Sequence, residues 1–429
     1  MSRSSKTFDI LRFQYRAALL IFLWLFPFVL FFSLAGEVPL SLAGEKTDRP
    51  SDNKKRAALE KIKALVGPQD AVLLADASGH ILFAENEHAL LVPASILKLL
   101  TSLVAIDSLG EDFRFKTEFF MDKQGNLKIK GYGDPLLISE VISGISKTLS
   151  QHLQAFNDLI LDPLYFGEPL VIPGITSSLE PYDSPNGALC ANFNTVYFKK
   201  EKGRFISAES QTPLLPIILP GIKRSGLNEG RILLSSENDE CLNYAGHLFL
   251  YYMNQNHISS TGSVRTGKVN PSVDRLILTH TSQYPLTFIL QQLLEYSSNF
   301  IANQLLLATS AKALSEPANL DKGVSLLKNY ALKELGEKNI FLREGSGISR
   351  DNKISTAFML KVLNRFYPYR GLMRREGNVY YKTGTLTGVR SRAGYIENEK
   401  GEFFRFVIIL NTPGKSDKAV LNQLLEIVQ

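Results

Sequence analysis

The segment that says most about the architecture of this chain is Pro93-Ala94-Ser95-Ile96-Leu97-Lys98, which opens a strongly apolar stretch that reaches Ile106. Proline favours the first turn of a helix, and Gly110 stands where such a helix is expected to end. Apolar residues on nearly every side predict a helix that is buried at the centre of its domain. The sequence therefore predicts Ser95 and Lys98 at the start of a buried helix.

Ser95 and Lys98 form an S-x-x-K element, and residues three apart share one face of a helix. The Lys98 amine can then lie against the Ser95 hydroxyl, and the helix N-terminus favours negative charge that develops there. Burial among leucine and isoleucine lowers the pKa of a lysine, so that it can act as a neutral base. The pattern alone is weak, because Ser51–Lys54 and Ser325–Lys328 also match it.

Two further polar elements follow later in the chain. Ser297-Ser298-Asn299 is an S-x-N triplet that precedes an apolar run, where it could equally serve as a helix cap. Lys382-Thr383-Gly384-Thr385 lies in a strand-like stretch, and by itself it could be a β-turn with an exposed lysine. In the order S-x-x-K, S-x-N and K-T-G, however, the three elements are the motif set of penicillin-binding proteins and serine β-lactamases.

Composition excludes several classes of protein. A length of 429 residues favours two domains, and 45% hydrophobic with 21% charged residues is ordinary for a globular chain. The formal net charge is +6, but residues 1–16 carry four basic residues against one acidic residue. The remainder is only mildly basic, so we expect no nucleic-acid partner.

The N-terminus has the pattern of an export segment. After the basic start, an uncharged apolar run extends from Ala17 to Phe32, and small residues precede Gly36 and Gly44. This order is typical of a secretory signal. A retained membrane anchor is the alternative, although the run is shorter than the ~20 residues of a comfortable span and contains Pro27. In either case we expect an exported protein of the periplasm or cell envelope, with possible membrane association through this segment.

Cysteine and histidine give no sign of a metal site. Cys190 and Cys241 lie far apart without a CxxC spacing, and the six histidines form no HExxH-like pair. Export permits a disulfide, but two small buried thiols are the favoured interpretation. We therefore expect neither a metal nor a cofactor.

From about residue 57 to the C-terminus, the chain resembles the D-alanyl-D-alanine carboxypeptidase/endopeptidase family of low-molecular-mass class C penicillin-binding proteins. The resemblance implies an α+β fold with a serine β-lactamase/penicillin-binding transpeptidase-like domain, an antiparallel sheet flanked by helices, and an inserted module. Besides the three motifs, the matching stretches are Gly131–Pro135, Pro181–Pro185, Ala191–Asn194, Glu344–Arg350 and Lys382–Arg390.

The amino-acid composition also agrees with an insertion, because proline, glycine and asparagine recur between the first two motifs. We expect 1–44 as export signal or membrane anchor, 45–56 as linker, 57–113 and 271–429 as the two parts of the transpeptidase-like domain, and 114–270 as an inserted β-rich module. The expected elements outside the module are a helix at 57–66, a hairpin at 71–84, helices at 285–312 and 319–335, strands near 377–384, 390–397 and 403–411, and a helix from about 416.

The resemblance also implies roles for the motif residues. Ser95 would attack the carbonyl of a terminal D-Ala-D-Ala peptide of peptidoglycan, and Lys98 would take its proton. Ser297 would relay a proton to the departing amine, while Asn299 would hold Lys98 and the substrate amide.

The K-T-G strand would bind the end of the substrate. Lys382 would supply a charge for the substrate carboxylate, helped by the hydroxyls of Thr383 and Thr385. Backbone N–H groups of Ser95 and Thr385 would form the oxyanion hole. β-Lactams mimic the dipeptide and should acylate the same serine.

Three questions stay open at this point. A β-lactamase shares the three motifs, and a catalytically idle peptidoglycan-binding scaffold could keep the fold. The sequence does not distinguish a carboxypeptidase from an endopeptidase. Ser346, in Gly345-Ser346-Gly347, lacks a G-x-S-x-G frame and is interpreted as part of a glycine-rich turn, whereas Arg350 could line the cleft.

Overall fold

The computed structural model describes residues 50–167, 170–176, 183–235, 239–314 and 316–428. The predicted export segment at 1–44 lies outside these residues, as do Pro181 and Tyr182 of one matching stretch. Across the described ranges, no helix has both the length and the apolar character that a membrane span requires.

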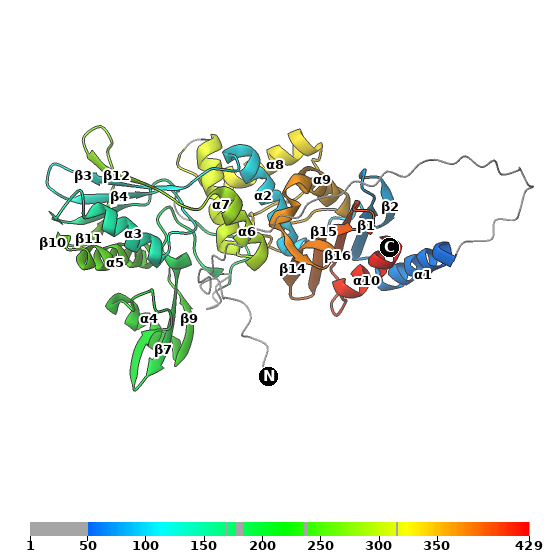
Figure 1. Ribbon diagram of the computed structural model, residues 1–429, viewed down its shortest axis with the longest axis horizontal. Coiled ribbons are helices and arrows are strands. Elements are labelled where there is room, and N and C mark those ends of the chain that lie inside the picture. Colours follow the sequence, from blue (N-terminus) through cyan, green and yellow to red (C-terminus); the bar gives the residue numbers. More distant parts are fainter. Residues whose placement is uncertain (1–49, 168–169, 177–182, 236–238, 315, 429) are drawn as a thin grey trace, which may run out of the picture.

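A six-stranded antiparallel sheet joins the two ends of the described chain (Figure 1). Its central neighbours are β1, from the first part of the sequence, and β16, from the last, with Val72 opposite Ile408. The strand order is β13 (Arg374–Glu376), β14 (Val379–Leu386), β15 (Val389–Glu397), β16 (Phe403–Leu410), β1 (Asp70–Ala75) and β2 (Ile81–Glu85).

Helices cover both faces of this sheet, which explains why every residue of β1 is buried. Ala71 and Leu73 point into one core, and Val72 and Leu74 into the other. The second face is covered by α1 (Pro50–Leu65) and α10 (Asp417–Val428). The first face packs directly against α9 (Thr356–Phe366). It shares one hydrophobic core with α2 (Lys98–Leu109), α6 (Leu286–Tyr296), α7 (Asn299–Leu314) and α8 (Leu320–Leu335).

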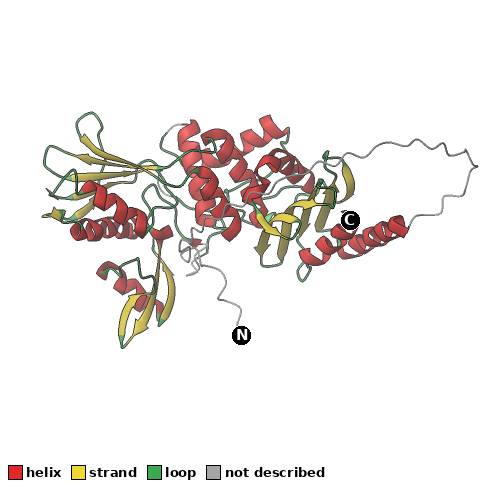
Figure 2. Ribbon diagram, viewed as in Figure 1, coloured by secondary structure: helices red, strands yellow, loops and turns green. Residues whose placement is uncertain are grey.

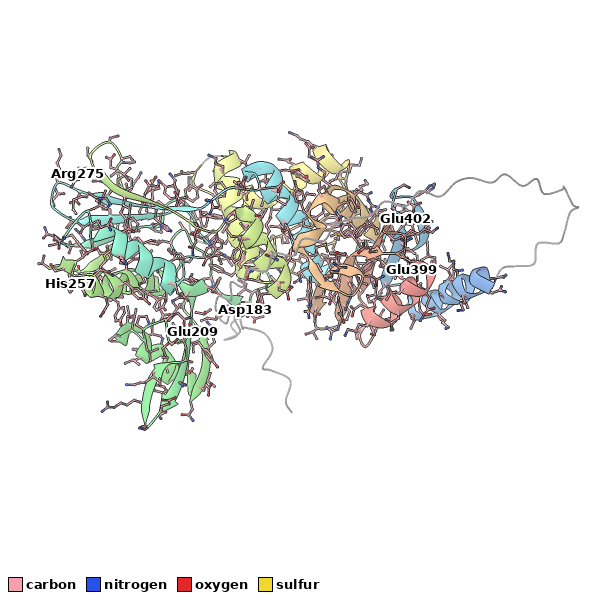
Figure 3. The ribbon with its side chains drawn as sticks, viewed as in Figure 1. Asp183, Glu209, His257, Arg275, Glu399 and Glu402 are labelled. Atoms are coloured by element: carbon pink, nitrogen blue, oxygen red, sulfur yellow. The ribbon has the colours of Figure 1, made fainter. Side chains whose placement is uncertain are left out.

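The residues that we expect to form the inserted module have a hydrophobic core of their own and lie beyond these helices, so that the helices stand between two sheet regions (Figure 2). Arg275 and His257 mark its outer end, opposite Glu399 and Glu402 at the β15–β16 turn (Figure 3). Its five-stranded sheet has the order β11 (Val264–Thr266), β6 (Leu159–Asp162), β4 (Leu127–Gly131), β3 (Lys116–Met121) and β12 (Arg275–Thr281), and it packs with α3 (Ser139–Leu149) and α5 (Glu240–Gln255). A projecting part holds β8 (Arg204–Ser207), β7 (Thr195–Glu201), β9 (Glu229–Leu233) and α4 (Leu219–Ser225), and a short pair holds β5 (Ala155–Phe156) and β10 (Ser259–Ser260).

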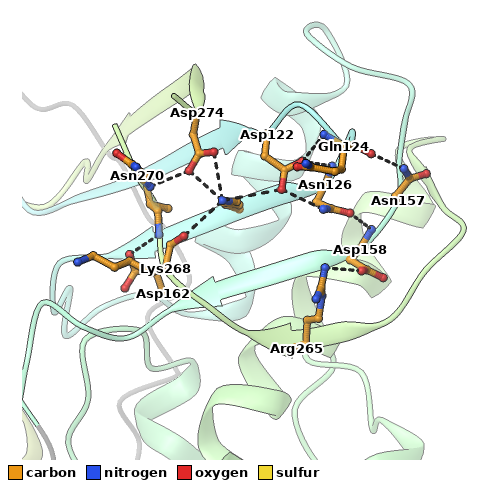
Figure 4. A network of polar contacts seen from close by, with 12 residues as sticks. Asp122, Gln124, Asn126, Asn157, Asp158, Asp162, Arg265, Lys268, Asn270 and Asp274 are labelled. Atoms are coloured by element: carbon orange, nitrogen blue, oxygen red, sulfur yellow. Dashed lines mark hydrogen bonds and ion pairs between the residues drawn. The ribbon is translucent and has the colours of Figure 1, made fainter. Parts of the chain in front are cut away.

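A polar network holds the five-stranded sheet to its connecting loops (Figure 4). The amine of Lys128, on β4, lies 2.9 and 3.1 Å from the carboxylate oxygens of Asp274 and 3.8 Å from Asp122 Oδ2. It also donates to the Lys268 carbonyl at 3.3 Å. The Lys128 and Asp274 side chains are only 13% and 2% exposed, so this ion pair is shielded from solvent.

The expected α+β class with an antiparallel sheet flanked by helices is confirmed. Three details of the structure differ from the prediction or add to it. The helix expected from 57 begins at Pro50, so 50–56 are helical and not linker, since proline suits a first turn and lysine and alanine continue it. The module is not simply β-rich, because it contains α3, α4 and α5. Its sheet also includes β12, beyond the expected boundary at 270.

Both cysteines carry free thiols. Cys190 is buried, and burial raises the pKa of its thiol to about 12, against the opposing effect of the Asn194 amide. Cys241 is partly exposed, so only one of the two matches the expected buried thiol.

Candidate active site

The three motifs meet where the start of α2, the α6–α7 junction and β14 converge. Ser95 lies in a short 3-10 helix, η1 (Ala94–Leu97), and the α-helix proper begins at Lys98. Ala94, directly before Ser95, has φ +49°, a left-handed conformation that is unfavourable for a residue with a Cβ atom. It is fully buried, so packing around it fixes this conformation and with it the direction of Ser95.

Lys98 is the centre of the polar contacts. Its amine donates to Ser95 Oγ at 2.8 Å, to Asn299 Oδ1 at 2.7 Å and to the Ser346 carbonyl at 2.7 Å. The side chain has no exposed surface. Burial holds the pKa of Lys98 well below its ordinary value, the positive charge of Lys382 lowers it further, and the Glu344 carboxylate opposes both effects.

At the α6–α7 junction, one residue caps a helix and its neighbour contacts Lys98. Ser297 ends α6 in a left-handed conformation, with φ 59° and ψ 34°. The Ser298 hydroxyl accepts from the Ile301 N–H at 3.1 Å, so Ser298 caps the first turn of α7. Asn299 begins α7 and contacts Lys98. Within the described ranges, no hydrogen bond joins the Ser297 hydroxyl to Ser95 or Lys98.

Strand β14 brings the K-T-G element against η1. Lys382 is 2% exposed, and burial lowers its pKa to about 7, with Arg374 adding to this effect and Glu295 opposing it. The amine donates to the Thr383 carbonyl at 2.8 Å. Thr383 is half-buried and Thr385 is exposed.

Glycine at 384 permits the close approach of this strand. A Cβ at this position would stand 2.7 Å from the Ser95 nitrogen and 2.2 Å from Ser391 Oγ, nearer than packed atoms allow. Ser391, on β15, donates to the Pro93 carbonyl at 2.5 Å. The sheet and the turn that carries Ser95 are therefore joined directly.

Sequence reasoning did not find the third partner of Lys98. It interpreted the Ser346 region as a turn, and a backbone carbonyl leaves no mark on residue identity. The glycine at position 347 was the signal in the sequence that this loop packs closely against another segment. Its φ is +84°, and a Cβ there would stand 1.9 Å from the Ala94 carbonyl oxygen. Arg350, in the same loop, donates to the Thr387 carbonyl.

This geometry is suited to nucleophilic catalysis by serine. The Ser95 hydroxyl faces an amine whose pKa is depressed, which is the arrangement that activates a serine without histidine. A second buried lysine lies close enough to influence the first and offers a charge for an anionic substrate group. Among the residues that the structure describes, no group of three His, Cys, Asp or Glu side chains is arranged to hold a metal.

The sequence model of the D-Ala-D-Ala carboxypeptidase 3 (S13) family matches residues 54–213, 229–371 and 368–429. The chain is 24% identical over 394 residues to D-alanyl-D-alanine carboxypeptidase DacB of Haemophilus influenzae, with 76% of this chain and 81% of the relative covered. It is 25% identical over 426 residues to a D-alanyl-D-alanine carboxypeptidase of Actinomadura sp. strain R39, with 81% and 78% covered.

Solved structures share the fold. The crystal structure of penicillin binding protein 4 from Haemophilus influenzae has a TM-score of 0.69 at 20% identity, covering 86% of this chain and 97% of that one. The endopeptidase Bd3459 of Bdellovibrio bacteriovorus has a TM-score of 0.50 at 18% identity, covering 83% and 90%.

Proposed function

This chain belongs to the D-Ala-D-Ala carboxypeptidase 3 (S13) family, and from that premise we propose that it hydrolyses D-Ala-D-Ala bonds of peptidoglycan stem peptides through an acyl-enzyme on Ser95. The observation that carries the proposal is the buried Lys98 amine, within 2.8 Å of Ser95 Oγ and 2.7 Å of Asn299 Oδ1. A serine and a lysine in such contact form a nucleophile and its base.

Acylation begins when Lys98 takes the Ser95 proton and Ser95 Oγ bonds to the carbonyl carbon of the penultimate D-alanine. Backbone N–H groups of Ser95 and Thr385 stabilise the negative charge on the carbonyl oxygen, a contribution of ~3 kcal/mol per donor. Ser297 relays this proton from Lys98 to the nitrogen of the terminal D-alanine as the peptide bond breaks, so that D-alanine leaves and Lys98 is neutral again. Water then attacks the ester carbonyl carbon, and neutral Lys98 takes a proton from the water. Lys98 returns this proton to Ser95 Oγ as the ester bond breaks, which releases the shortened peptide and restores the free serine.

The carboxylate of the terminal D-alanine binds at β14. Lys382 supplies the positive charge, and the Thr383 and Thr385 hydroxyls donate hydrogen bonds. The bound anion favours the charged form of Lys382 against the burial that lowers its pKa. Asn299 orients Lys98 through Oδ1 and holds the substrate amide.

Benzylpenicillin tests the proposal, because a β-lactam presents a strained amide and a carboxylate to the same groups. The intact mass of the full chain is measured after incubation, beside Ser95→Ala. A stable adduct on the wild type alone supports an acyl-enzyme on Ser95. Consumed drug without an adduct indicates a β-lactamase, and an unmodified protein with intact drug indicates a non-catalytic scaffold.

Release of D-alanine from a pentapeptide and cleavage of a cross-linked muropeptide dimer separate carboxypeptidase from endopeptidase activity. The family description favours the first, and we expect D-alanine release.

The peptide bonds in question lie outside the cytoplasmic membrane, so the proposal includes export, through the basic and apolar N-terminal segment, to the periplasm or cell envelope. Fractionation of cells, with a wash at high salt, distinguishes a released protein from one anchored in the membrane.

A further inference from the structure

A carboxylate with no exposed surface lies behind the candidate active site, at Glu344. Burial of an ionised carboxylate is unfavourable unless its oxygens are hydrogen-bonded. The donors to its two oxygens are the N–H and hydroxyl of Ser346, both at 2.6 Å, the Asn303 amide at 3.2 Å, the Asn352 amide at 2.6 Å, and the N–H groups of Gly347 and Ser349 at 2.7 and 3.3 Å. All six are neutral donors, and four come from the loop that follows Glu344.

These contacts fix a loop that touches the nucleophile and the base. The Ser346 carbonyl accepts from Lys98 Nζ at 2.7 Å. Gly347 packs against Ala94 so closely that a Cβ would overlap the Ala94 carbonyl oxygen. The Gly345 carbonyl accepts from Thr101 Oγ1 at 2.6 Å, which ties the loop to α2.

The two acceptors on Lys98 determine how a neutral amine is oriented. A neutral amine has two N–H bonds and one lone pair, and the Ser346 carbonyl can only accept. Asn299 also presents its carbonyl oxygen to Lys98. When these two oxygens take the two N–H bonds, the lone pair is directed at the third neighbour, Ser95 Oγ, 2.8 Å away.

We infer that Glu344 is a positioning residue for acylation, which holds the Ser346 carbonyl so that the Lys98 lone pair faces Ser95. The inference rests on the proposed function. Glu344 has no hydrogen bond to Lys98 among the contacts described above and acts through the loop. Its negative charge has a second effect at a distance, since it opposes the fall in the pKa of Lys98 that burial causes.

Glu344→Gln is the informative substitution, because it keeps the size of the side chain but turns an N–H₂ group toward donors. We expect the rate of acylation of the full chain by benzylpenicillin to fall ~100-fold, since a displacement of about 1 Å has effects of this order. Loss of the negative charge lowers the pKa of Lys98 further. The acid limb of the rate against pH therefore moves to lower pH.

Glu344→Asp and Asp162→Asn are the matched variants. Glu344→Asp keeps the negative charge, so the acid limb of its acylation rate should lie nearer to the wild-type pH than that of Glu344→Gln, even if its rate stays low. Asp162 is also a buried carboxylate that holds a loop, through the N–H groups of Leu164 and Val269 at 2.9 and 2.8 Å, but it lies in the module. Asp162→Asn should lower the unfolding temperature and leave the rate and its limb unchanged.

The outcomes separate this inference from the proposed function. A wild-type protein that benzylpenicillin does not acylate contradicts the proposed function, and the inference falls with it. If the wild type is acylated, and Glu344→Gln is acylated at the same rate with the same acid limb, the inference is contradicted and the proposed function stands. A slow Glu344→Gln whose acid limb stays in place, or moves to higher pH, also contradicts it, because a general destabilisation that does not act on Lys98 then explains the loss. If Glu344→Gln does not fold, Glu344→Asp still tests it, since a wild-type rate there contradicts the positioning role.

Discussion

Two buried lysines with opposite tasks share the candidate site. In the function that we propose, Lys98 must be neutral to accept a proton, whereas Lys382 must be charged to attract a carboxylate. Burial lowers both pKa values, and the charge on Lys382 lowers that of Lys98 further. The downward shift favours the neutral form that Lys98 needs, whereas a bound substrate carboxylate favours the charged form that Lys382 needs.

The pKa of Lys382, about 7, predicts the alkaline limb of activity. Below this pH the amine is charged and binds the substrate carboxylate; above it the free enzyme loses the charge. We expect kcat/KM for a D-Ala-D-Ala peptide to fall as the pH rises through about 7. Lys382→Arg stays charged throughout, so its kcat/KM, although lower, should lose this limb. A wild-type profile that stays flat to pH ~9 contradicts the assignment, because an ordinary lysine titrates near 10.4.

Lys98→Met tests the base directly. Methionine has a similar length and no exposed surface is available at this position, so the packing of α2 is largely kept. We expect acylation by benzylpenicillin to slow by ~1,000-fold, in line with the loss of a general base. Stopped-flow measurement of the rate checks this, and circular dichroism confirms that the fold is retained. An acylation rate near that of the wild type would mean that another group takes the Ser95 proton.

At the residue scale, the sequence predicted the groups whose chemistry depends on side-chain type. Lys98 contacts both Ser95, three residues before it, and Asn299, 201 positions after it, and Lys382 is buried beside them. The Ser346 carbonyl was missed because every residue has one. Glu344 was noticed only within a matching stretch, since neither its burial nor its six donors follow from the letters around it.

At the scale of elements, the contact between β14 and η1 depends on Gly384. An added methyl group meets the Ser95 nitrogen, which belongs to the backbone and cannot rotate away. We expect Gly384→Ala to push β14 from η1 and slow acylation by ~100-fold, because the N–H groups of Ser95 and Thr385, which we propose as oxyanion donors, would then separate. The rate with benzylpenicillin measures the effect.

Gly144→Ala is the control for this glycine substitution. Gly144 lies in α3 of the module, with nothing within 4 Å of an added Cβ. Alanine is favoured over glycine inside a helix, so the unfolding temperature should rise slightly and acylation should not change. Equal loss of activity in the two variants would show that Gly384 has no special relation to Ser95.

Prediction of elements succeeded where one periodicity dominated. The hairpin near 71–84 and the three C-terminal strands agree with β1, β2, β14, β15 and β16. The helix expected at 285–312 is two helices, because Ser297 adopts a left-handed conformation that apolar periodicity does not reveal. The sequence analysis missed α5 because the polar and glycine-rich residues around it favoured strands and turns. One face of this helix is nevertheless buried in the core of the module.

At the scale of the whole molecule, separate cores predict separate responses. The core of the module includes Phe119 and Phe249, whereas the core behind the site includes Leu103 and Phe358. We propose the module as an insertion that runs from about residue 114 through β12, which ends at Thr281. A change inside it should then affect its own stability more than the chemistry at Ser95.

Lys128→Met tests this separation. Asp274, with a 2% exposed side chain, would lose its cation and keep the Asn270 N–H at 2.7 Å. Breaking a buried ion pair on one side destabilises by about 3 kcal/mol, so the unfolding transition of the module should move to lower temperature. Acylation of Ser95 at 25 °C should be unchanged. Lys199→Met, which breaks the exposed pair with Glu201, should leave the unfolding transition nearly unchanged. If Lys128→Met slows acylation as much as it lowers stability, the module and the site form one cooperative unit.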